Sequence, residues 1–339
     1  MNSRQKFLLG VAAGAVGALA GLRVARNSRA MDFAGRVVVI TGGSRGLGLV
    51  IARRLASEGA RLVLLARDEE ELARAAAQFP PGVDVMPLRC DIRRRADVRA
   101  AVDTILDRWN VVDVLINNAG VIQVGPLEHM TTGDFENAMA THFWGPLHLM
   151  FEIVPSMRRR GFGRIVNISS IGGRLAVPHL GPYCASKFAL VGLSDALRAE
   201  LDQYGIRVTT VTPGLMRTGG PVNAAMKGQH EAEYAWFAIA DSLPGLTTSA
   251  ERAARQIVEA CRYGDSELTI SVPARVAMMM NNVAPGAVAR AMMVANRLMP
   301  GPNVQSGNER RRGVESTSKW APSAATVLTD KAAAANNEV

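Results

Sequence analysis

Short apolar runs alternate with amphipathic stretches through the centre of the chain. Runs rich in aliphatic and β-branched residues predict strands at 36–40, 61–66, 84–89, 112–116, 164–169, 206–211 and 267–270. Between them, stretches such as 46–59 and 95–109 repeat apolar residues three and four positions apart, as helices packed on one face do. Strands that are apolar throughout and separated by helices indicate a parallel sheet covered on both faces. The pattern predicts a doubly wound, Rossmann-like α/β fold.

The N-terminus departs from this pattern. Residues 1–31 carry five basic side chains and no acidic one, placed around an apolar run at 7–22. The run has three interpretations: a secretory signal peptide, a membrane anchor or surface helix, and a helical arm packed on the protein itself. Its 16 residues span about 24 Å as a helix, slightly less than a hydrocarbon core of about 30 Å. We favour membrane association, because no charge interrupts the run and cations flank both ends.

The C-terminal part of the chain divides into two segments. Residues 273–300 place apolar and basic side chains on different faces of a predicted helix. This amphipathic helical extension lies on a membrane surface, covers the mouth of a binding site or packs against a second subunit. Residues 301–339 show neither helical nor strand periodicity, and we predict a disordered tail there.

The net charge of +9 is concentrated at the N-terminus. Beyond residue 31, 34 basic residues face 30 acidic ones, which is an ordinary balance. We find no basic stripe interleaved with aromatic residues, which argues against a nucleic-acid partner. The three cysteines are far apart in the sequence, so neither a disulfide framework nor a metal-binding cluster is indicated. We therefore expect a reducing, cytoplasmic compartment and no metal.

A glycine-rich turn follows the first predicted strand. The sequence TGGSRGLG at 41–48 leads directly into a predicted helix. Gly42, Gly46 and Gly48 allow a tight turn, close approach of the backbone to a pyrophosphate, and close packing of the helix on the strand. The N-terminus of the helix then faces the anion. Between an apolar strand and an amphipathic helix, this turn predicts a dinucleotide site.

The end of the second predicted strand indicates which dinucleotide is bound. An acidic residue at this place holds the ribose 2′-hydroxyl of NAD, whereas arginine accommodates the 2′-phosphate of NADP. Here Arg67 follows the strand, and Arg45 in the glycine-rich turn supplies a second cation. Arginine suits a phosphate because its planar fork donates two hydrogen bonds. We favour NADP(H) over NAD(H); the alternative is that both arginines are merely solvated.

Several motifs occur in a characteristic order. They are TGGSRGLG (41–48), CDI (90–92), NNAG (117–120), NISS (167–170), YCASK (183–187) and TPGLMRT (212–218). In this order and at these intervals they resemble the short-chain dehydrogenase/reductase family over about residues 35–270. The resemblance implies a single catalytic domain at 32–272 with a seven-stranded parallel sheet. It also implies NAD(P)-dependent interconversion of an alcohol and a carbonyl, by a homo-oligomer.

The resemblance assigns roles to individual residues. Tyr183 corresponds to the proton donor or acceptor, and Lys187 to the cation that holds the nicotinamide ribose and lowers the tyrosine pKa. Ser170 corresponds to the residue that donates a hydrogen bond to the substrate oxygen. Positions corresponding to cofactor contacts are Gly42, Ser44, Arg45, Gly46, Leu47, Gly48, Arg67, Asp91, Ile92, Asn118, Tyr183, Lys187, Pro213, Gly214 and Thr218.

One position departs from the family pattern. His142 stands where the family usually places an asparagine that supports a water chain between the lysine and solvent. Imidazole donates and accepts hydrogen bonds as an amide does, so one hypothesis is a proton relay through His142 that titrates near its reference pKa of ~6.5. The other is a histidine packed among Phe143 and Trp144.

The segment after the sixth predicted strand selects substrates in this family. In residues 219–245, Met226, Tyr234, Trp236 and Phe237 form either an apolar lid or ordinary core. A lid would favour a bulky, lipid-like carbonyl or alcohol. We expect a membrane-associated enzyme whose domain faces the cytoplasm, where its cofactor is found. The alternative is a non-catalytic NADP-binding sensor or scaffold that retains the fold, a hypothesis motivated only by His142.

Overall fold

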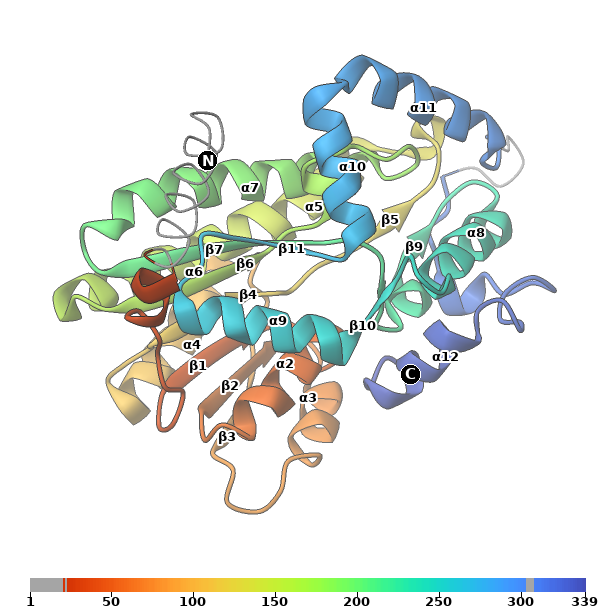
Figure 1. Cartoon of the computed structure of the whole chain (residues 1–339). Coiled ribbons are helices and arrows are strands. Elements are labelled where there is room, and N and C mark those ends of the chain that lie inside the picture. The colour runs from red at the N-terminus through yellow and green to blue at the C-terminus, as the bar shows by residue number, and fades with distance from the viewer. Residues whose placement is uncertain (1–20, 22, 303–307) are drawn as a thin grey trace, which may run out of the picture.

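A computed structural model describes residues 21, 23–302 and 308–339, and it has a central sheet between layers of helices (Figure 1). The strands of this sheet are β1 (Val37–Thr41), β2 (Arg61–Ala66), β3 (Val85–Arg89), β4 (Val114–Asn117), β6 (Gly163–Ile168), β7 (Ile206–Pro213) and β11 (Glu267–Ile270). The helices are α2 (Gly46–Ala56), α3 (Glu69–Ala76), α4 (Arg95–Trp109), α5 (Thr132–Met139), α6 (Gly145–Arg160), α7 (Gly181–Asp202), α8 (His230–Ser242), α9 (Ala250–Tyr263), α10 (Val272–Val283), α11 (Pro285–Leu298) and α12 (Val327–Ala335).

The seven strands are arranged in the order β11-β7-β6-β4-β1-β2-β3, and all neighbours pair in parallel. The chain starts near the centre at β1, passes through β2 to one edge, and returns through β4 to the other. This order is that of a doubly wound sheet, which confirms the predicted fold class. All seven predicted strands are present, each within a few residues of its expected bounds.

Each face of the sheet is covered by its own hydrophobic core. On one face α2, α3 and α9 contribute Leu55, Leu72 and Ile257, all nearly inaccessible to solvent. On the other face α4, α6 and α7 contribute side chains such as Ile105 and Leu149. Burial of the sheet on both faces explains why its strands read as continuous apolar runs.

Short strands and helical turns lie at the carboxyl edge of the central sheet. A small sheet joins β5 (Gln123–Val124), β9 (Ala225–Met226) and β12 (Arg311–Arg312), and a second pairs β8 (Met216–Arg217) with β10 (Thr248–Ser249). Between the strands and helices lie the 3₁₀ turns η1 (Leu127–His129), η3 (Ile171–Gly173), η4 (Gly220–Asn223) and η5 (Gly313–Glu315), and the π-helical turn η2 (Ala140–Trp144). Helix α8 packs against β8, β9, η4 and η5.

The prediction of a disordered C-terminal tail is wrong for residues 308–339. This segment contains β12, η5 and α12, and Ala321 and Ala333 are buried in it. Its buried positions are small residues, which leave no strong apolar periodicity in the sequence. Alanine has the highest helix propensity, so contact with α8 is enough to hold α12.

The apolar run at 7–22 lies outside the described residues, apart from Gly21. Residues 23–27 are helical, and the Arg26 guanidinium forms a two-bond ion pair with Asp265. Among the described residues no helix combines the length and the hydrophobicity needed to cross a bilayer.

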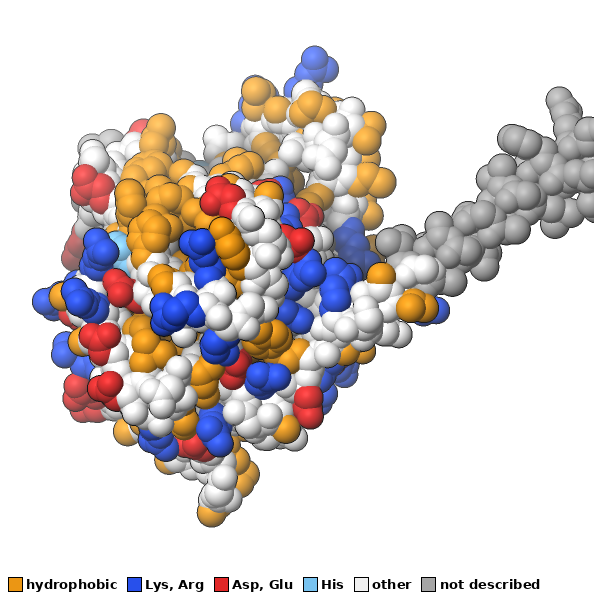
Figure 2. Space-filling model, turned by 90° about the vertical axis from the view of Figure 1, so that its left-hand side faces the viewer, with side chains coloured by type: hydrophobic (Ala, Val, Ile, Leu, Met, Phe, Trp, Pro, Cys, Tyr) orange, Lys and Arg blue, Asp and Glu red, His pale blue; other side chains and the backbone are white. Residues whose placement is uncertain are grey.

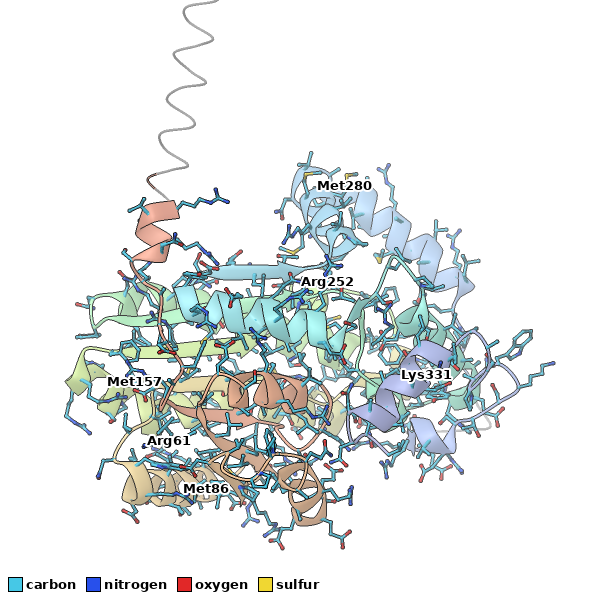
Figure 3. All side chains as sticks on the ribbon, turned by 60° about the horizontal axis from the view of Figure 1, so that its bottom comes forward. Arg61, Met86, Met157, Arg252, Met280 and Lys331 are labelled. Atoms are coloured by element: carbon cyan, nitrogen blue, oxygen red, sulfur yellow. The ribbon has the colours of Figure 1, made fainter. Side chains whose placement is uncertain are left out.

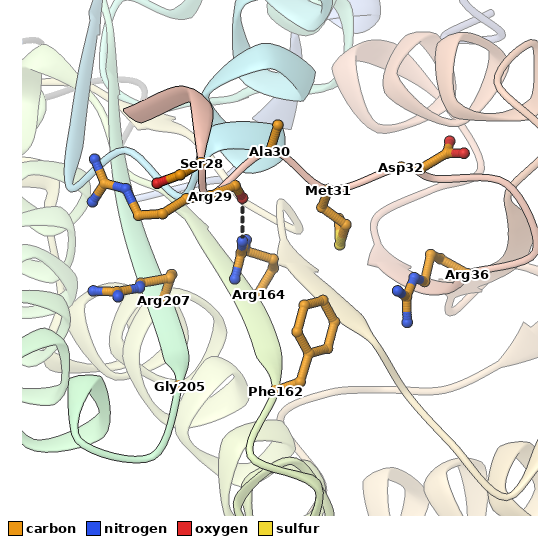
Figure 4. Close-up of a pocket in the computed structure, with 10 residues that line it drawn as sticks. All are labelled: Ser28, Arg29, Ala30, Met31, Asp32, Arg36, Phe162, Arg164, Gly205 and Arg207. Carbon is orange, nitrogen blue, oxygen red and sulfur yellow. Dashed lines mark hydrogen bonds between the residues drawn. The ribbon is translucent and has the colours of Figure 1, made fainter. Parts of the chain in front are cut away.

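A hollow of about 350 Å³ lies at the amino ends of the strands (Figure 4). Arg29, Arg36, Arg164 and Arg207 line it, and the Arg164 guanidinium donates to the Arg29 carbonyl at 2.9 Å. The glycine-rich turn and the motifs that follow the strands lie at the opposite, carboxyl edge. The hollow is therefore separate from the candidate site.

Candidate functional site

The candidate residues converge at the carboxyl edge of the sheet. The glycine-rich turn follows β1, Arg67 follows β2, Asn118 follows β4 and Ser170 follows β6. Pro213 ends β7, and the Gly214 amide donates to Ile270 at the end of β11. Because all these strands are parallel, their carboxyl ends meet at one edge, where α/β sheets bind ligands.

The glycine-rich turn packs too closely to accept side chains. A Cβ added at Gly48 would lie 2.1 Å from the Gly42 carbonyl oxygen and 2.6 Å from Asn118 Nδ2. Gly42 and Gly46 have φ values of 62° and 54°, which favour glycine. Asn118 holds the turn by donating from Nδ2 to the Thr41 carbonyl at 3.0 Å and to the Gly42 carbonyl at 3.2 Å. The turn thus has a backbone without side chains at the N-terminus of α2, a geometry that fits a dinucleotide pyrophosphate.

The two arginines near this turn have different surroundings. Arg45 Nη1 lies 2.9 Å from Glu71 Oε1, and its Nε lies 3.4 Å from Glu338 Oε2. Arg67 is exposed, and it forms no ion pair with any residue that the structure describes. Arg67 is therefore the freer of the two cations to meet a phosphate.

Asp91 and Ile92 follow β3. The Asp91 carboxylate is bound by the Arg93 guanidinium, and this hydrogen bond holds the pKa of Asp91 below its usual range. Ile92 is buried, and its carbonyl lies 3.2 Å from His148 Nδ1. Asp91 is thus an ionised carboxylate at the carboxyl end of β3, where it can accept hydrogen bonds.

Tyr183 and Ser170 meet across the site. Tyr183 lies in the first turn of α7, directly after Pro182, and the Ser170 side chain is close enough to its hydroxyl to lower the pKa of the phenol. The Ser170 Oγ also accepts a hydrogen bond from the Gly172 amide at 3.0 Å. These contacts bring the two hydroxyls predicted to bind one substrate oxygen to the same place.

Lys187 lies one helical turn beyond Tyr183. Its Nζ donates to the Ile168 carbonyl at 2.8 Å and lies 5.7 Å from the centre of the Tyr183 ring. The side chain is buried at only 4% exposure. Ser169 donates to the Lys187 carbonyl at 3.1 Å, which ties this part of α7 to the end of β6.

Burial opposes the lowering of the Tyr183 pKa that the resemblance assigns to Lys187. Burial raises the pKa of Tyr183 to about 12, against a lowering effect of the hydrogen bond with Ser170. Burial also lowers the pKa of Lys187 to about 7. Desolvation disfavours the charged form of each group, and this cost exceeds the attraction that a phenolate and an ammonium would gain.

His142 lies in the π-helical turn η2, between α5 and α6. Its Nε2 accepts a hydrogen bond from the Val121 amide at 3.1 Å, so the ring proton is on Nδ1. Nδ1 then donates this proton to Ser186 Oγ, 2.7 Å away. Burial, reinforced by Lys187, lowers the pKa of His142 well below 6.5. The expected titration near 6.5 is therefore wrong. Nδ1 binds Ser186 of α7, and Nε2 binds the backbone at Val121, after β4.

We predict that His142→Asn leaves the pH profile of turnover unchanged between pH 6 and pH 8. Burial lowers the pKa of the imidazole well below 6.5, so His142 should contribute no inflection near that pH. Turnover rates measured at half-unit steps of pH check this. A wild-type inflection near pH 6.5 that disappears in the variant would restore the relay hypothesis.

Helix α8 forms the wall opposite α7. Met226, Tyr234 and Phe237 are buried in one cluster with Cys184 of α7, so they belong to the core rather than to an open lid. Trp236 is partly buried against the same cluster. Glu233 ties the wall together, since its carboxylate accepts from Trp236 Nε1 at 2.6 Å and lies 2.7 Å from His179 Nδ1.

The sequence analysis missed Asp241 of α8. It is only 7% exposed and lies on the same helix face as Phe237 and Ala238, which pack beside Tyr183. Its charge raises the pKa of Tyr183, and burial raises the pKa of Asp241 itself to about 8. The signal in the sequence was an acidic residue directly after the apolar stretch 234–240.

We predict that Asp241→Asn stabilises the protein increasingly as the pH rises from 4 to 8. In this window the unfolded chain has an ionised carboxylate and the folded chain a protonated one, so the wild type loses stability on the way to pH 8. Asparagine does not titrate, and we expect a gain of about 2–4 kcal/mol at pH 8 and almost none at pH 4. Urea unfolding at both pH values checks this, with the exposed Asp103→Asn as control. Equal differences at both pH values would contradict it.

Comparisons with known proteins identify the family. The family profile described as short chain dehydrogenase matches residues 36–227, which include the glycine-rich turn, Ser170, Tyr183 and Lys187. The chain is a member of the short-chain dehydrogenase/reductase family. It is similar to dehydrogenase/reductase SDR family member 7B of Mus musculus, at 32% identity over 296 residues that cover 85% of this chain and 90% of the relative. The zebrafish (Danio rerio) protein of the same name is 39% identical over 222 residues, covering 63% and 72%.

Solved short-chain dehydrogenases share the fold. A Burkholderia phymatum enzyme in complex with NAD is 27% identical with a TM-score of 0.69, over 76% of this chain and 96% of the other. L-sorbose reductase of Gluconobacter frateurii, complexed with NADPH and L-sorbose, is 28% identical with a TM-score of 0.64, over 71% and 97%. The protein is therefore an oxidoreductase of a family that uses a nicotinamide cofactor.

Proposed function

We propose that this protein is an NADP(H)-dependent oxidoreductase that interconverts a carbonyl and an alcohol. The observation that carries the proposal is the meeting of the Ser170 and Tyr183 hydroxyls, one helical turn from the Lys187 ammonium, at the edge that holds the glycine-rich turn. NADPH bound at this edge supplies the hydride for reduction, and NADP⁺ accepts it in the reverse direction.

The residues of the chain handle the substrate oxygen and its proton. Ser170 donates a hydrogen bond to the carbonyl oxygen and holds it beside Tyr183. A phenol with a pKa of about 12 keeps its proton at neutral pH, so Tyr183 is ready to give it to the alkoxide that forms on reduction. Oxidation reverses this transfer. Lys187, with a pKa of about 7, is able to hold the nicotinamide ribose and to replace the lost proton.

The preference for NADP(H) is supported by Arg67, which is exposed beside β2 and is not bound to an acid among the described residues. Titration of NADPH and NADH by fluorescence tests it: Arg67→Ala should weaken NADPH binding by about tenfold or more and leave NADH binding unchanged. The control is Arg61→Ala, because Arg61 is exposed at the amino end of β2, away from the site. Equal affinity for both dinucleotides would refute the preference.

An apolar substrate is supported by the side chains around Tyr183. Ile122, Val177 and Trp236 are partly buried against the same cluster and leave apolar surface beside the phenol. A panel of medium-chain and polycyclic ketones should be reduced faster than sugars. A preference for polyhydroxylated substrates would contradict this part of the proposal.

A homo-oligomer is supported by apolar side chains on α6 and α7. Phe151 and Phe188 are 58% and 43% exposed on these helices, and Trp144 beside them is 49% exposed. Hydrophobic side chains gather on the upper part of the face in Figure 2, the side on which α6 and α7 lie in Figure 1. Light scattering of the wild type should give the mass of a dimer or tetramer. The double variant Phe151→Glu/Phe188→Glu should give the mass of a monomer. A wild-type monomer would contradict the assembly.

Membrane association through residues 7–22, with the domain in the cytoplasm, is supported by the α10–α11 hairpin. Val276, Met279 and Met293 are between 49% and 64% exposed there, and residues 268–308 contain arginines but no acid. Met280 and the start of the described chain lie on the same side of the molecule (Figure 3). In a flotation experiment, the full chain should rise with anionic vesicles. A chain without residues 1–22 should stay in the lower fractions. Recovery of neither would argue against membrane binding.

A further inference from the structure

The last residues of the chain lie on the glycine-rich turn. The Gly46 amide donates to the Asn336 carbonyl at 2.8 Å, and Asn337 Nδ2 donates to the Ser44 carbonyl at 2.8 Å. Glu338 Oε2 lies 3.4 Å from Arg45 Nε. The chain therefore uses for its own C-terminus the groups that the sequence assigns to the dinucleotide.

The same residues also bind the opposite side of the site. Asn223 Nδ2 donates to the Glu338 side chain at 2.7 Å and to its carbonyl at 2.8 Å. Asn336 Nδ2 donates to the Thr218 carbonyl at 3.4 Å, and Ala333 packs against Gly219. The C-terminal segment thus bridges the glycine-rich turn and the segment after β7.

The position of Glu338 is that of a bound anion. Its carboxylate faces the N-terminus of α2, where the Gly46 position leaves so little room that an added Cβ would lie 2.5 Å from Glu338 Oε1. Helix N-termini and arginine both favour negative charge. A cofactor phosphate would compete with the C-terminal segment for this place, because the Asn336 carbonyl already accepts from the Gly46 amide and Glu338 fills the space in front of Gly46.

The C-terminal segment is held weakly against the rest of the protein. Its buried side chains are small or polar, among them Ala321, Thr326 and Ala333, so it buries little apolar surface. Thr329 Oγ1 and Asn336 Oδ1 are buried without a hydrogen-bond partner, which weakens the docked state. A ligand with several phosphate contacts is able to displace such a segment.

We propose that residues 336–338 form an autoinhibitory strap that competes with NADP(H) for the glycine-rich turn. The inference rests on the proposed function, since it requires the cofactor to bind there. The apparent dissociation constant of the cofactor equals its intrinsic value divided by the fraction of protein with the strap released. Removal of the strap should therefore tighten NADPH binding without any change in the residues that bind it.

The test compares the full chain with a chain that ends at Ala335, by fluorescence titration with NADPH. We expect the shortened chain to bind NADPH about tenfold more tightly, as for a strap closed about nine-tenths of the time. Glu338→Ala should give part of this gain, and Lys331→Ala, on the exposed side of α12 (Figure 3), none. A synthetic peptide of residues 327–339 should weaken NADPH binding to the shortened chain.

Hydrogen exchange gives a second readout in the full chain. Addition of NADPH should release protection at residues 327–338 and increase it at the glycine-rich turn. Equal NADPH affinity with and without the strap, or weaker binding without it, would overturn the strap while leaving the proposed function intact. Absence of NADPH binding in both chains would instead refute the proposed function.

Discussion

Tyr183→Phe is expected to reduce turnover by about 10³-fold and to leave NADPH affinity within about twofold. The change removes the proton that the alkoxide must receive, together with the hydrogen bond to Ser170. The ring remains, so two contacts persist. Its centre lies 5.5 Å from the centre of the His142 ring in an edge-on arrangement, and it packs beside Cys184. Steady-state kinetics with a ketone, together with NADPH titration of the same preparation, check both expectations.

Tyr204→Phe is the matched control for this variant. Tyr204 lies just after α7, and its ring stacks on Arg158 rather than in the site, so the loss of its hydroxyl should leave turnover unchanged. Substantial turnover in Tyr183→Phe would show that another group delivers the proton. Asp241, which is protonated at neutral pH and lies near Tyr183, would then be the first candidate.

Gly48→Ala is expected to weaken NADPH binding by at least 100-fold and to destabilise the fold. Its Cβ would lie 2.1 Å from the Gly42 carbonyl oxygen, and this neighbour is backbone, so the whole turn must move. The displacement would also break the hydrogen bonds from Asn118 that shape the turn. Overpacking of this kind typically costs about 1–3 kcal/mol of stability.

Gly192→Ala is the control for that variant. Gly192 lies inside α7, and an added Cβ there meets no described atom within 4 Å. Alanine in a helix interior is favoured over glycine by about 0.5–1 kcal/mol, so this variant should be slightly more stable and bind NADPH normally. Normal NADPH binding by Gly48→Ala would mean that the dinucleotide does not approach this turn.

The sheet was predictable because each strand is buried on both faces and so reads as an unbroken apolar run. The carboxyl-edge location of Ser170 and Tyr183 was predictable too, since parallel strands bring the ends of β1, β4 and β6 together. Helix α4 was expected at 95–109 and is observed at Arg95–Trp109. In these elements, local pattern and tertiary packing agree.

The remaining features depend on contacts that no local pattern carries. The docking of residues 308–339 uses alanine, threonine and asparagine, whose burial leaves no periodic signal. The pKa values of Tyr183 and Lys187 follow from how completely the fold desolvates both groups, which their spacing on α7 does not reveal. The lowered pKa of His142 follows from its complete burial and from Lys187, which lies near it only in the folded chain.

Transfer of deuterium from NADPH labelled at the nicotinamide C4 tests the central claim most directly. The full chain and the chain ending at Ala335 would be incubated with the labelled cofactor and an apolar ketone, and the alcohol analysed by mass spectrometry. We predict an alcohol that carries one deuterium on the former carbonyl carbon. The Tyr183→Phe variant should form no labelled alcohol above background. Tight NADPH binding without deuterium in any alcohol, across the whole ketone panel, would contradict catalysis and favour a cofactor-binding sensor.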